Sequence, residues 1–359
     1  MTIKAAVVGT SFGARIHLPA LRSAGFDVVA LVGTDAAKTA RRAERFGVGS
    51  ACTSLAQALE IGIDAVSIAT PPATHAPLAT EAIEAGCHVL CEKPFTLDAP
   101  QAAALVDAAA RARRVGMVGH EFRWSHTQSL VEWALREGRI GEPRLAVSIS
   151  FLSMLREITM PPWWYEVEAG GGWLGASGSH RVDALRQWFG EVDAVSAGLT
   201  ALSEPCLGVD DGFTIRFKMR GGVEACVVQN ASSVGPMFSV TRVMGTAGTL
   251  WVEGDAVKLA DGEHPGGVRL DPPEGFELPD VEELAVGPLA DMTRSELPPY
   301  IRLATAFRRE IEGDPPLPGP LPATFADGLA CMRVIEAARC SAARDGAWIE
   351  VEGPKGGGR

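Results

Sequence analysis

Apolar and polar positions divide the first third of the chain into a regular alternation. Short apolar runs of strand length recur in KAAVVG, DVVALVG, DAVSIAT, HVLCEKP and RVGMVGH. The alanine-rich stretches between them predict helices over residues 16–24, 36–46, 54–59, 76–85 and 99–113. Because strand and helix alternate so often, this part of the chain is predicted to be α/β, with a doubly wound parallel sheet.

The pattern changes beyond about residue 144, where the runs become longer, alternate more strictly and follow one another closely. They are RLAVSISFL, VDAVSAGLTAL, DGFTIRFKM, GVEACVVQNASSV, FSVTRVMG and GTLWVEG. Such runs predict a large, open-faced and mostly antiparallel sheet, accompanied by helices over 125–138 and 175–189. Residues 254–299 are rich in Pro, Gly and acidic residues and predict a long, partly ordered excursion.

Two further helices are predicted over 299–312 and 322–345, around the stiff linker GDPPLPGPLP. The chain is therefore predicted to form an N-terminal doubly wound domain over residues 1–122. An α+β domain over 123–352 carries the open sheet, and residues 353–359 form a flexible tail.

Composition narrows the class of partner. The 359 residues carry a net charge of −11, which argues against nucleic acid and an anionic membrane surface. No apolar run approaches the ~20 residues that a membrane helix needs. The first strand begins at Ile3, which leaves no room for a signal peptide, and an odd count of seven cysteines fits a reducing compartment. We therefore expect a cytoplasmic protein with a small-molecule ligand.

A zinc site is considered at CHVLC, where Cys87 and Cys91 flank His88. The run has the pattern of a strand, and no second ligand pair follows at the spacing of a zinc site. No metal is predicted.

The first predicted strand runs into a glycine-containing turn that is followed by a helix. Matched to the dinucleotide fingerprint G-x-G-x-x-G/A, Gly9 makes the tight turn and Ala14 allows close packing of helix on sheet. Ser11 replaces the middle glycine and can itself donate to a phosphate. The candidate cofactor-binding residues here are Gly9, Thr10, Ser11, Phe12, Gly13 and Ala14.

The end of the second strand indicates which dinucleotide binds. An NAD site places a carboxylate there, whereas this strand ends in Gly33 and Thr34. The cations Lys38, Arg41 and Arg42 follow and suit a 2′-phosphate, although they also fit a solvated helix face. Asp35 lies two residues beyond the expected carboxylate. NADP is predicted, with NAD as the alternative.

The stretch ATPPATHAPLATEAIEAGCHVLCEKPF, residues 69–95, resembles the glucose–fructose oxidoreductase / inositol dehydrogenase family. VVGTSFGARIHLPAL, the GGG…GSHRVD helix and LACMRVIEAARCSA extend the resemblance over most of the chain. The family implies a Rossmann domain, an open-faced sheet domain, and a nicotinamide cofactor between them. It also implies hydride transfer to or from a sugar-like or cyclic alcohol carbon.

The resemblance also assigns residues. Thr70, Pro71 and His75 match a cofactor loop, and Glu92 and Lys93 match the pair whose lysine points at the reacting oxygen. On the substrate side, Arg123 matches a lining arginine, Glu121 stands where asparagine is frequent, and Asp183 matches a second aspartate. His180 matches the active-site histidine. Ala176 replaces a catalytic aspartate of many members, which argues against inositol itself as the substrate.

The chemistry of alcohol oxidation gives these residues roles. Lys93 can hydrogen-bond the oxygen and stabilise the alkoxide, and His180 is the natural second proton carrier. The alternative for each is an ordinary surface lysine and a packing histidine. Two other functions remain open, namely a glycosidase that retains its cofactor and a regulator that senses a dinucleotide.

The glycines at 170–172 are expected to let the backbone approach a ligand. Beside them Trp163, Trp164 and Tyr165 can stack on a sugar ring or close the core. The strands EACVVQN and FSVTRVMG have apolar residues that no predicted helix covers, so a homodimer or homotetramer through the C-terminal sheet is expected.

Overall fold

The protein is described by a computed structural model covering residues 2–204, 208–286 and 289–353. The chain forms two compact units. Unit 1 comprises residues 1–96, 100–125 and 275–329, and unit 2 comprises 97–99, 126–274 and 330–359. This division differs from the linear one predicted, because residues 275–329 return to the N-terminal unit. Of the predicted tail, only Gly353 lies among the described residues.

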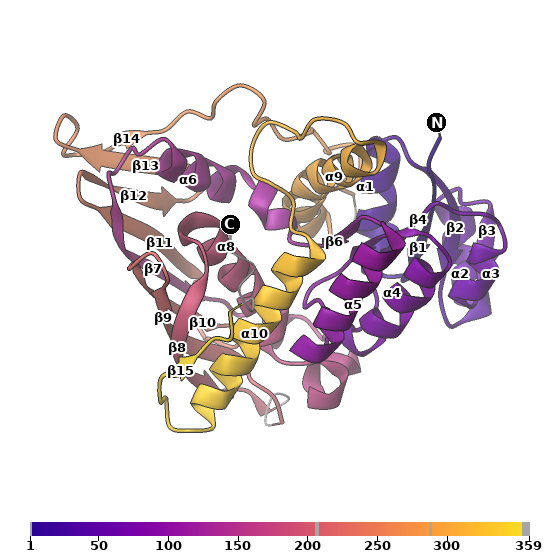
Figure 1. Ribbon diagram of the computed structural model, residues 1–359, viewed down its shortest axis with the longest axis horizontal. Helices are drawn as coiled ribbons and strands as arrows, with labels where there is room; N and C mark the ends of the chain where they lie inside the picture. The colour runs from indigo at the N-terminus through magenta and orange to yellow at the C-terminus, as the bar shows by residue number, and fades with distance from the viewer. Residues whose placement is uncertain (1, 205–207, 287–288, 354–359) are drawn as a thin grey trace. The chain divides into compact units, whose positions relative to one another are not determined.

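Unit 1 contains a six-stranded sheet in which every neighbouring pair is parallel, in the order β3-β2-β1-β4-β5-β6 (Figure 1). This is the strand order of a Rossmann fold, which confirms the predicted fold class. The strands are β1 (Lys4–Val8), β2 (Asp27–Val32), β3 (Ser50–Cys52), β4 (Ala65–Ile68), β5 (His88–Cys91) and β6 (Gly116–Val118). The run CHVLC thus contributes β5.

The helices of unit 1 follow the predicted alanine-rich stretches closely. They are α1 (Leu18–Ser23), α2 (Ala36–Arg45), α3 (Leu55–Leu59), α4 (His75–Glu84), α5 (Ala99–Ala112) and α9 (Ala290–Glu312). The stretch before α1 differs from the prediction, because Gly13–His17 is a π-helix rather than the start of an α-helix. Single π turns occur most often at functional sites.

Helix α9 explains why residues 275–329 belong to unit 1. Its Leu297, Tyr300 and Phe307 are fully buried in one core with residues of α1 and of the strands. The helix was predicted to begin only at residue 299. The helix instead begins at Ala290 and continues through Pro298 and Pro299.

Unit 2 contains a nine-stranded sheet in the order β14-β13-β12-β11-β7-β10-β9-β8-β15 (Figure 1). Neighbours are antiparallel except β10 and β7, which run parallel, so the predicted mostly antiparallel sheet is confirmed. The strands are β7 (Pro143–Phe151), β8 (Val192–Thr200), β9 (Gly212–Met219), β10 (Glu224–Asn230), β11 (Phe238–Gly245), β12 (Gly248–Glu253), β13 (Ala256–Asp261), β14 (Val268–Arg269) and β15 (Ile349–Glu350).

One face of this sheet is buried and the other is open. On β9 the residues Phe213, Ile215 and Phe217 are buried, while the alternating Thr214 and Arg216 are exposed. The helices of unit 2 are α6 (His126–Arg136), α7 (Met154–Glu157) and α8 (Ser179–Phe189), and α10 (Phe325–Ala342) begins in unit 1 and ends in unit 2. Helix α6 lies beside β13 and beside α8 (Figure 1).

Four short strands were not predicted. β13 and β14 lie inside the segment expected to be an irregular excursion, and β3 and β15 are edge strands of two or three residues. Their sequences have little apolar alternation, and each strand forms because a neighbouring strand offers hydrogen-bonding groups.

Candidate active site

The turn after β1 in unit 1 is built for close approach of backbones. Gly9 has φ +124°, and a Cβ there would lie 2.1 Å from the carbonyl oxygen of Ala69. A Cβ on Gly13 would lie 3.0 Å from Val7 and 3.1 Å from Ala69. The tight packing that the fingerprint assigned to Ala14, which is fully buried, is therefore shared with Gly13. The turn has the shape that a dinucleotide pyrophosphate requires.

The side chains around the turn differ in exposure. Ser11 is exposed, Thr10 and Phe12 are half-buried, and the carbonyl of Ser11 accepts from the N–H of Arg15 at 3.2 Å. The Ser11 hydroxyl is thus available to a ligand.

The end of β2 is also compact. A Cβ on Gly33 would lie 2.4 Å from Thr10 Cγ2 and 2.6 Å from the hydroxyl of Thr39. The Asp35 carboxylate accepts from the N–H of Lys38 at 2.9 Å and so caps the first turn of α2. Asp35 therefore acts as a helix cap.

Four basic side chains surround a hollow of about 370 Å³ on α2. They are Lys38, Arg41, Arg42 and Arg45. Three of them, Lys38, Arg41 and Arg45, are exposed, and Arg42 is half-buried. A hollow with this lining suits a phosphate group.

The ring of His75 connects two loops through hydrogen bonds. Its ring is fully buried, with Nδ1 3.0 Å from the carbonyl of Pro94 and Nε2 2.9 Å from the carbonyl of Thr70. Burial lowers the pKa of His75. The structure thus gives this residue, predicted to bind cofactor, a positioning contact to the loop of Thr70 and Pro71.

Glu92 follows β5 and is buried, with Lys93 half-buried after it. The Glu92 carboxylate accepts from the Tyr300 hydroxyl, from His17 Nε2 at 3.2 Å, and from the N–H of Lys93 at 3.1 Å. Burial alone would raise the pKa of Glu92. The hydrogen bond from His17 and the charge of Lys93 outweigh burial and lower this pKa to about 2. The Lys93–Pro94 peptide bond is cis.

A second carboxyl, Glu121, is buried on the short 3₁₀ turn Glu121–Trp124. Burial and the charge of Glu296 raise the pKa of Glu121 well above its usual range. Burial also raises the pKa of Glu296, to whose carboxyl Glu121 is hydrogen-bonded. The raised pKa of each carboxyl favours one shared proton between Glu121 and Glu296 of α9.

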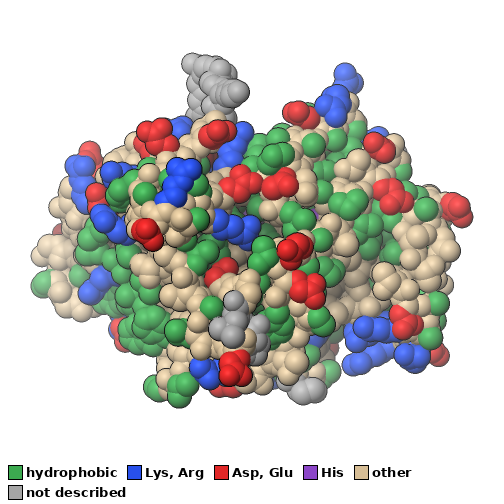
Figure 2. Space-filling model, turned by 90° about the horizontal axis from the view of Figure 1, so that it is seen from below, with side chains coloured by type: hydrophobic (Ala, Val, Ile, Leu, Met, Phe, Trp, Pro, Cys, Tyr) green, Lys and Arg blue, Asp and Glu red, His purple; other side chains and the backbone are tan. Residues whose placement is uncertain are grey.

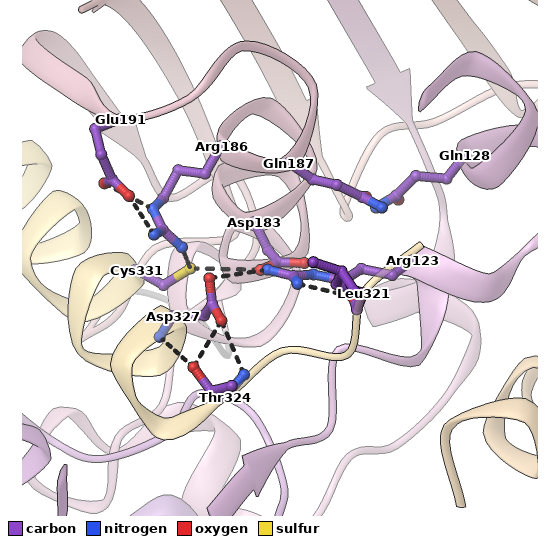
Figure 3. A network of polar contacts seen from close by, with 10 residues as sticks. All are labelled: Arg123, Gln128, Asp183, Arg186, Gln187, Glu191, Leu321, Thr324, Asp327 and Cys331. Atoms are coloured by element: carbon purple, nitrogen blue, oxygen red, sulfur yellow. Dashed lines mark hydrogen bonds and ion pairs between the residues drawn. The ribbon is translucent and has the colours of Figure 1, made fainter. Parts of the chain in front are cut away.

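Arg123, on the same turn, has partners within unit 1. Its guanidinium donates to the carbonyl of Leu321 at 3.0 Å and lies 3.3 Å from the Asp327 carboxylate. Asp327 also accepts from the N–H and hydroxyl of Thr324, at 2.9 and 2.8 Å (Figure 3). These contacts hold the guanidinium in one orientation.

In unit 2 the predicted histidine lies where a π-helix passes into α8. Ala176 is on the π-helix Leu174–Gly178, and His180 and Asp183 follow on α8, all three buried. The Cys331 thiol lies 4.0 Å from Asp183 Oδ1 (Figure 3). One π-helix of the described residues thus overlaps the predicted dinucleotide turn, and the other directly precedes the helix that carries His180.

Two of the three glycines before this helix, Gly171 and Gly172, pack closely against other parts of the protein. A Cβ on Gly171 would lie 2.6 Å from the carbonyl oxygens of Trp163 and Trp164. A Cβ on Gly172, where φ is +104°, would lie 2.4 Å from the Asp210 carboxylate. Gly171 and Gly172 thus admit neighbouring carbonyls and a carboxylate, and the approach of a ligand to these glycines stays a prediction.

The aromatic residues beside these glycines form a partly open cluster. Trp163, Trp164 and Tyr165 lie on the 3₁₀ turn Pro162–Tyr165, and each is half-buried. The two tryptophan rings are 5.2 Å apart, and Trp164 lies 6.3 Å from Trp173. Half-exposed rings in this arrangement can stack on a flat or cyclic ligand.

Comparison with known proteins identifies the family of the chain. Residues 3–120 match the model of the GFO/IDH/MocA oxidoreductase family with an NAD-binding Rossmann fold, and residues 130–251 match that family's C-terminal domain. A D-apiose dehydrogenase of Paraburkholderia graminis is 30% identical over 70% of this chain and 68% of its own. The chain belongs to the GFO/IDH/MocA family.

Other relatives agree with this membership. An uncharacterized oxidoreductase of Synechocystis is 35% identical, over 54% of this chain and about half (53%) of that relative's length. The solved structure of a levoglucosan dehydrogenase in complex with NADH has a TM-score of 0.84 at 23% identity, covering 98% of this chain and 100% of that one. The latter likeness shows the shared two-part GFO/IDH/MocA fold.

Several buried groups of this family member were not predicted as part of the site. His17 and Tyr300 hold Glu92, Glu296 is hydrogen-bonded to Glu121, and Asp210 accepts from the N–H of Leu174 at 2.6 Å. One available signal was the i, i+4 spacing of Glu296 and Tyr300, which puts both on one helix face.

No helix in the described part of the chain is long and apolar enough to cross a membrane.

Proposed function

We propose that the protein is an NADP-dependent oxidoreductase that transfers a hydride between the nicotinamide and an alcohol or carbonyl carbon. The substrate is sugar-like or a cyclic polyol. The observation that carries the proposal is the place of Lys93, at the carboxyl end of β5 in a Rossmann sheet, with its backbone N–H held by a buried carboxylate. Ligands of such sheets bind at the carboxyl ends of the strands.

Lys93 is assigned to the reacting oxygen. As hydride leaves the carbon, negative charge develops on this oxygen, and an ammonium group stabilises it. His180 is assigned as the second proton carrier, because a neutral imidazole accepts the hydroxyl proton during oxidation. The bound dinucleotide supplies the hydride acceptor.

The substrate class follows from the partly open aromatic cluster and from the relatives. Trp163, Trp164 and Tyr165 are assigned to stacking on a ring, with Glu121, Arg123 and Asp183 as the polar substrate-side residues. Relatives named D-apiose dehydrogenase and 1,5-anhydro-D-fructose reductase support a carbohydrate.

The test is incubation with NADP(H) or NAD(H) and a panel of sugars, keto sugars and cyclic polyols, followed by nicotinamide absorbance. A substrate-dependent net change supports the proposal. Tight dinucleotide binding with no change across the panel supports a sensing regulator instead, and cleavage of a glycoside with no net change supports a cofactor-retaining glycosidase. Either of these results overturns the oxidoreductase proposal.

Cofactor choice is the first prediction. The basic hollow on α2 and the capping role of Asp35 favour a 2′-phosphate, so NADPH should bind more tightly than NADH. Arg42→Ala should weaken NADPH binding by about tenfold, since a hydrogen bond to a charged group contributes about 1.5–3 kcal/mol. Fluorescence titration measures both affinities. Arg111→Ala, an exposed arginine at the end of α5, is the matched control and should change neither.

Equal or tighter binding of NADH by the wild type would establish NAD as the cofactor. In that case the basic side chains on α2 form only a solvated face.

The open face of the unit 2 sheet supports assembly. Ile149 on β7 pairs with Val228 on β10 and Val240 on β11, and all three are half-buried on the outward face. Phe238 is 51% exposed and its ring lies 6.0 Å from that of Phe151. Figure 2 shows hydrophobic side chains gathered at the left of its view, over these strands. We propose a homodimer or homotetramer through this face.

Sedimentation at micromolar concentration tests assembly. The wild type should sediment as a dimer or tetramer. Ile149→Lys should shift it to monomer, because association through this face would bury an unpaired lysine charge among apolar side chains. Ala56→Lys, at an exposed position of α3 in unit 1, should leave the assembly unchanged. A monomeric wild type rules out this interface.

A further inference from the structure

The side chain of Glu92 is held from two sides by residues distant in the sequence. We propose that His17 and Tyr300 are positioning residues for Lys93, acting through Glu92. The inference rests on the proposed function only in that Lys93 is taken to act on the reacting oxygen. The contacts themselves all lie within unit 1.

The hydrogen bonds of Glu92 divide between its two oxygens. Oε1 accepts from the Tyr300 hydroxyl and from His17 Nε2, whereas Oε2 accepts from the N–H of Lys93 at 3.1 Å. The oxygen that faces away from Lys93 is therefore fixed by two donors. A carboxyl group is planar and rigid, so fixing Oε1 also fixes the oxygen that binds the Lys93 backbone.

Both donors are themselves held in place. His17 Nδ1 lies 2.7 Å from the Ser67 hydroxyl, so both ring nitrogens have a hydrogen-bond partner. The His17 and Tyr300 rings are 4.5 Å apart, and Phe12 meets each of them edge-on, at 5.5 and 6.1 Å. Tyr300 and His17 are fully buried. These donors have no room to turn away from Glu92.

The packing leaves no space for another arrangement. A Cβ on Gly119, in the turn after β6, would lie 2.6 Å from the Tyr300 hydroxyl and 2.7 Å from Glu92 Oε1. The N–H of Gly119 donates to the carbonyl of Cys91 at 2.7 Å, which ties this turn to the end of β5. The backbone at Gly119 therefore packs directly against the pair of Glu92 and Tyr300.

The arrangement also determines the charges of the carboxyls near Lys93. Three buried or half-buried carboxyls interact electrostatically with Lys93, namely Glu92, Glu121 and Glu296. Arg15 interacts in the same way with Glu296. Burial raises the pKa of Glu121 well above its usual range, whereas the donors to Glu92 outweigh burial and lower its pKa. The hydrogen bonds from His17 and Tyr300, together with the charge of Lys93, thus favour the ionised form of the carboxyl bonded to the Lys93 backbone.

Tyr300→Phe tests the inference because it keeps the ring and removes only the donor. Turnover should fall by about tenfold, the scale of a misplaced catalytic group, while the affinity for NADPH stays within about twofold. A second readout needs no substrate. After reductive methylation with isotope-labelled methyl groups, the NMR signal of Lys93, identified by its loss in Lys93→Met, should move in Tyr300→Phe.

Phe307→Leu is the matched control. It lies on the same helix, is fully buried, and stacks on Phe26 at 5.8 Å. It should lower the melting temperature without lowering turnover or moving the Lys93 signal. Ser67→Ala removes only the hydrogen-bond partner of His17 and should lower turnover less than Tyr300→Phe does. It replaces Tyr300→Phe as the test variant if that variant does not fold.

Two results would overturn the inference. One is a Lys93 signal that stays in place in both Tyr300→Phe and Ser67→Ala. The other is a loss of turnover in Phe307→Leu as large as in Tyr300→Phe, which would make the effect one of stability. If no sugar or polyol is turned over by the wild type, the proposed function fails, but the Lys93 signal still decides this inference.

Discussion

Turnover by Lys93→Met should fall by about a hundredfold or more, while the affinity for the dinucleotide stays nearly unchanged. The methionine side chain fills similar space but has no charge, so the developing alkoxide loses the cation that stabilises it. The groups that form the dinucleotide turn, including Gly9 and Gly13, are untouched by the change. Steady-state kinetics and a fluorescence titration of the same preparation measure the two quantities.

Lys4→Met is the control, because Lys4 is exposed at the start of β1 in the same sheet. It should leave turnover and cofactor affinity as they are. If Lys93→Met keeps more than about a tenth of wild-type turnover, another group holds the oxygen. His120 and Arg123 are then the first residues to replace.

The second large effect is expected at His180. His180→Asn should cut the rate and largely abolish the acid limb of the pH–rate profile for alcohol oxidation, because that limb reports a base that must be neutral. Ala176→Asp restores a carboxylate one turn before the histidine and should stabilise the imidazolium. The acid limb should then move to higher pH by about one unit or more, since an opposite charge at close range favours the charged form.

Ala176→Asn separates charge from packing. Ala176 is buried, so a larger polar side chain costs stability whether or not it is charged. The asparagine variant should share the lower melting temperature of the aspartate variant but keep the wild-type pH profile. If neither His180→Asn nor Ala176→Asp alters the profile, His180 is a packing residue.

The fold class was predictable because periodicity records burial directly. Uniformly apolar runs marked β1, β2, β4, β5 and β6, since strands of a covered parallel sheet are buried on both faces. Strict alternation marked the open-faced strands such as β9. The short edge strands β3 and β15 escaped, because pairing with a neighbour rather than their own composition makes them strands.

The candidate site was predictable only where a motif keeps its residues together along the chain. The turn at Gly9, the Glu92–Lys93 pair and the helix carrying His180 were all found in this way. The roles of several glycines were not predictable from such motifs. Gly171 and Gly172 were expected to face a ligand, but their backbones are approached by Trp163 and Asp210, which no local pattern relates to them.

The sequence by itself determined the two sheets, the dinucleotide turn and the lysine and histidine on which the proposed chemistry depends. Only the tertiary structure decided that residues 275–329 return to unit 1 and bring Tyr300 to Glu92, a partner 208 positions away. The physical reason is that a buried carboxylate keeps its charge only if donors surround it, and those donors come from whichever segments the core packs together. Periodicity shows which face of α9 is buried, but not which buried group it meets.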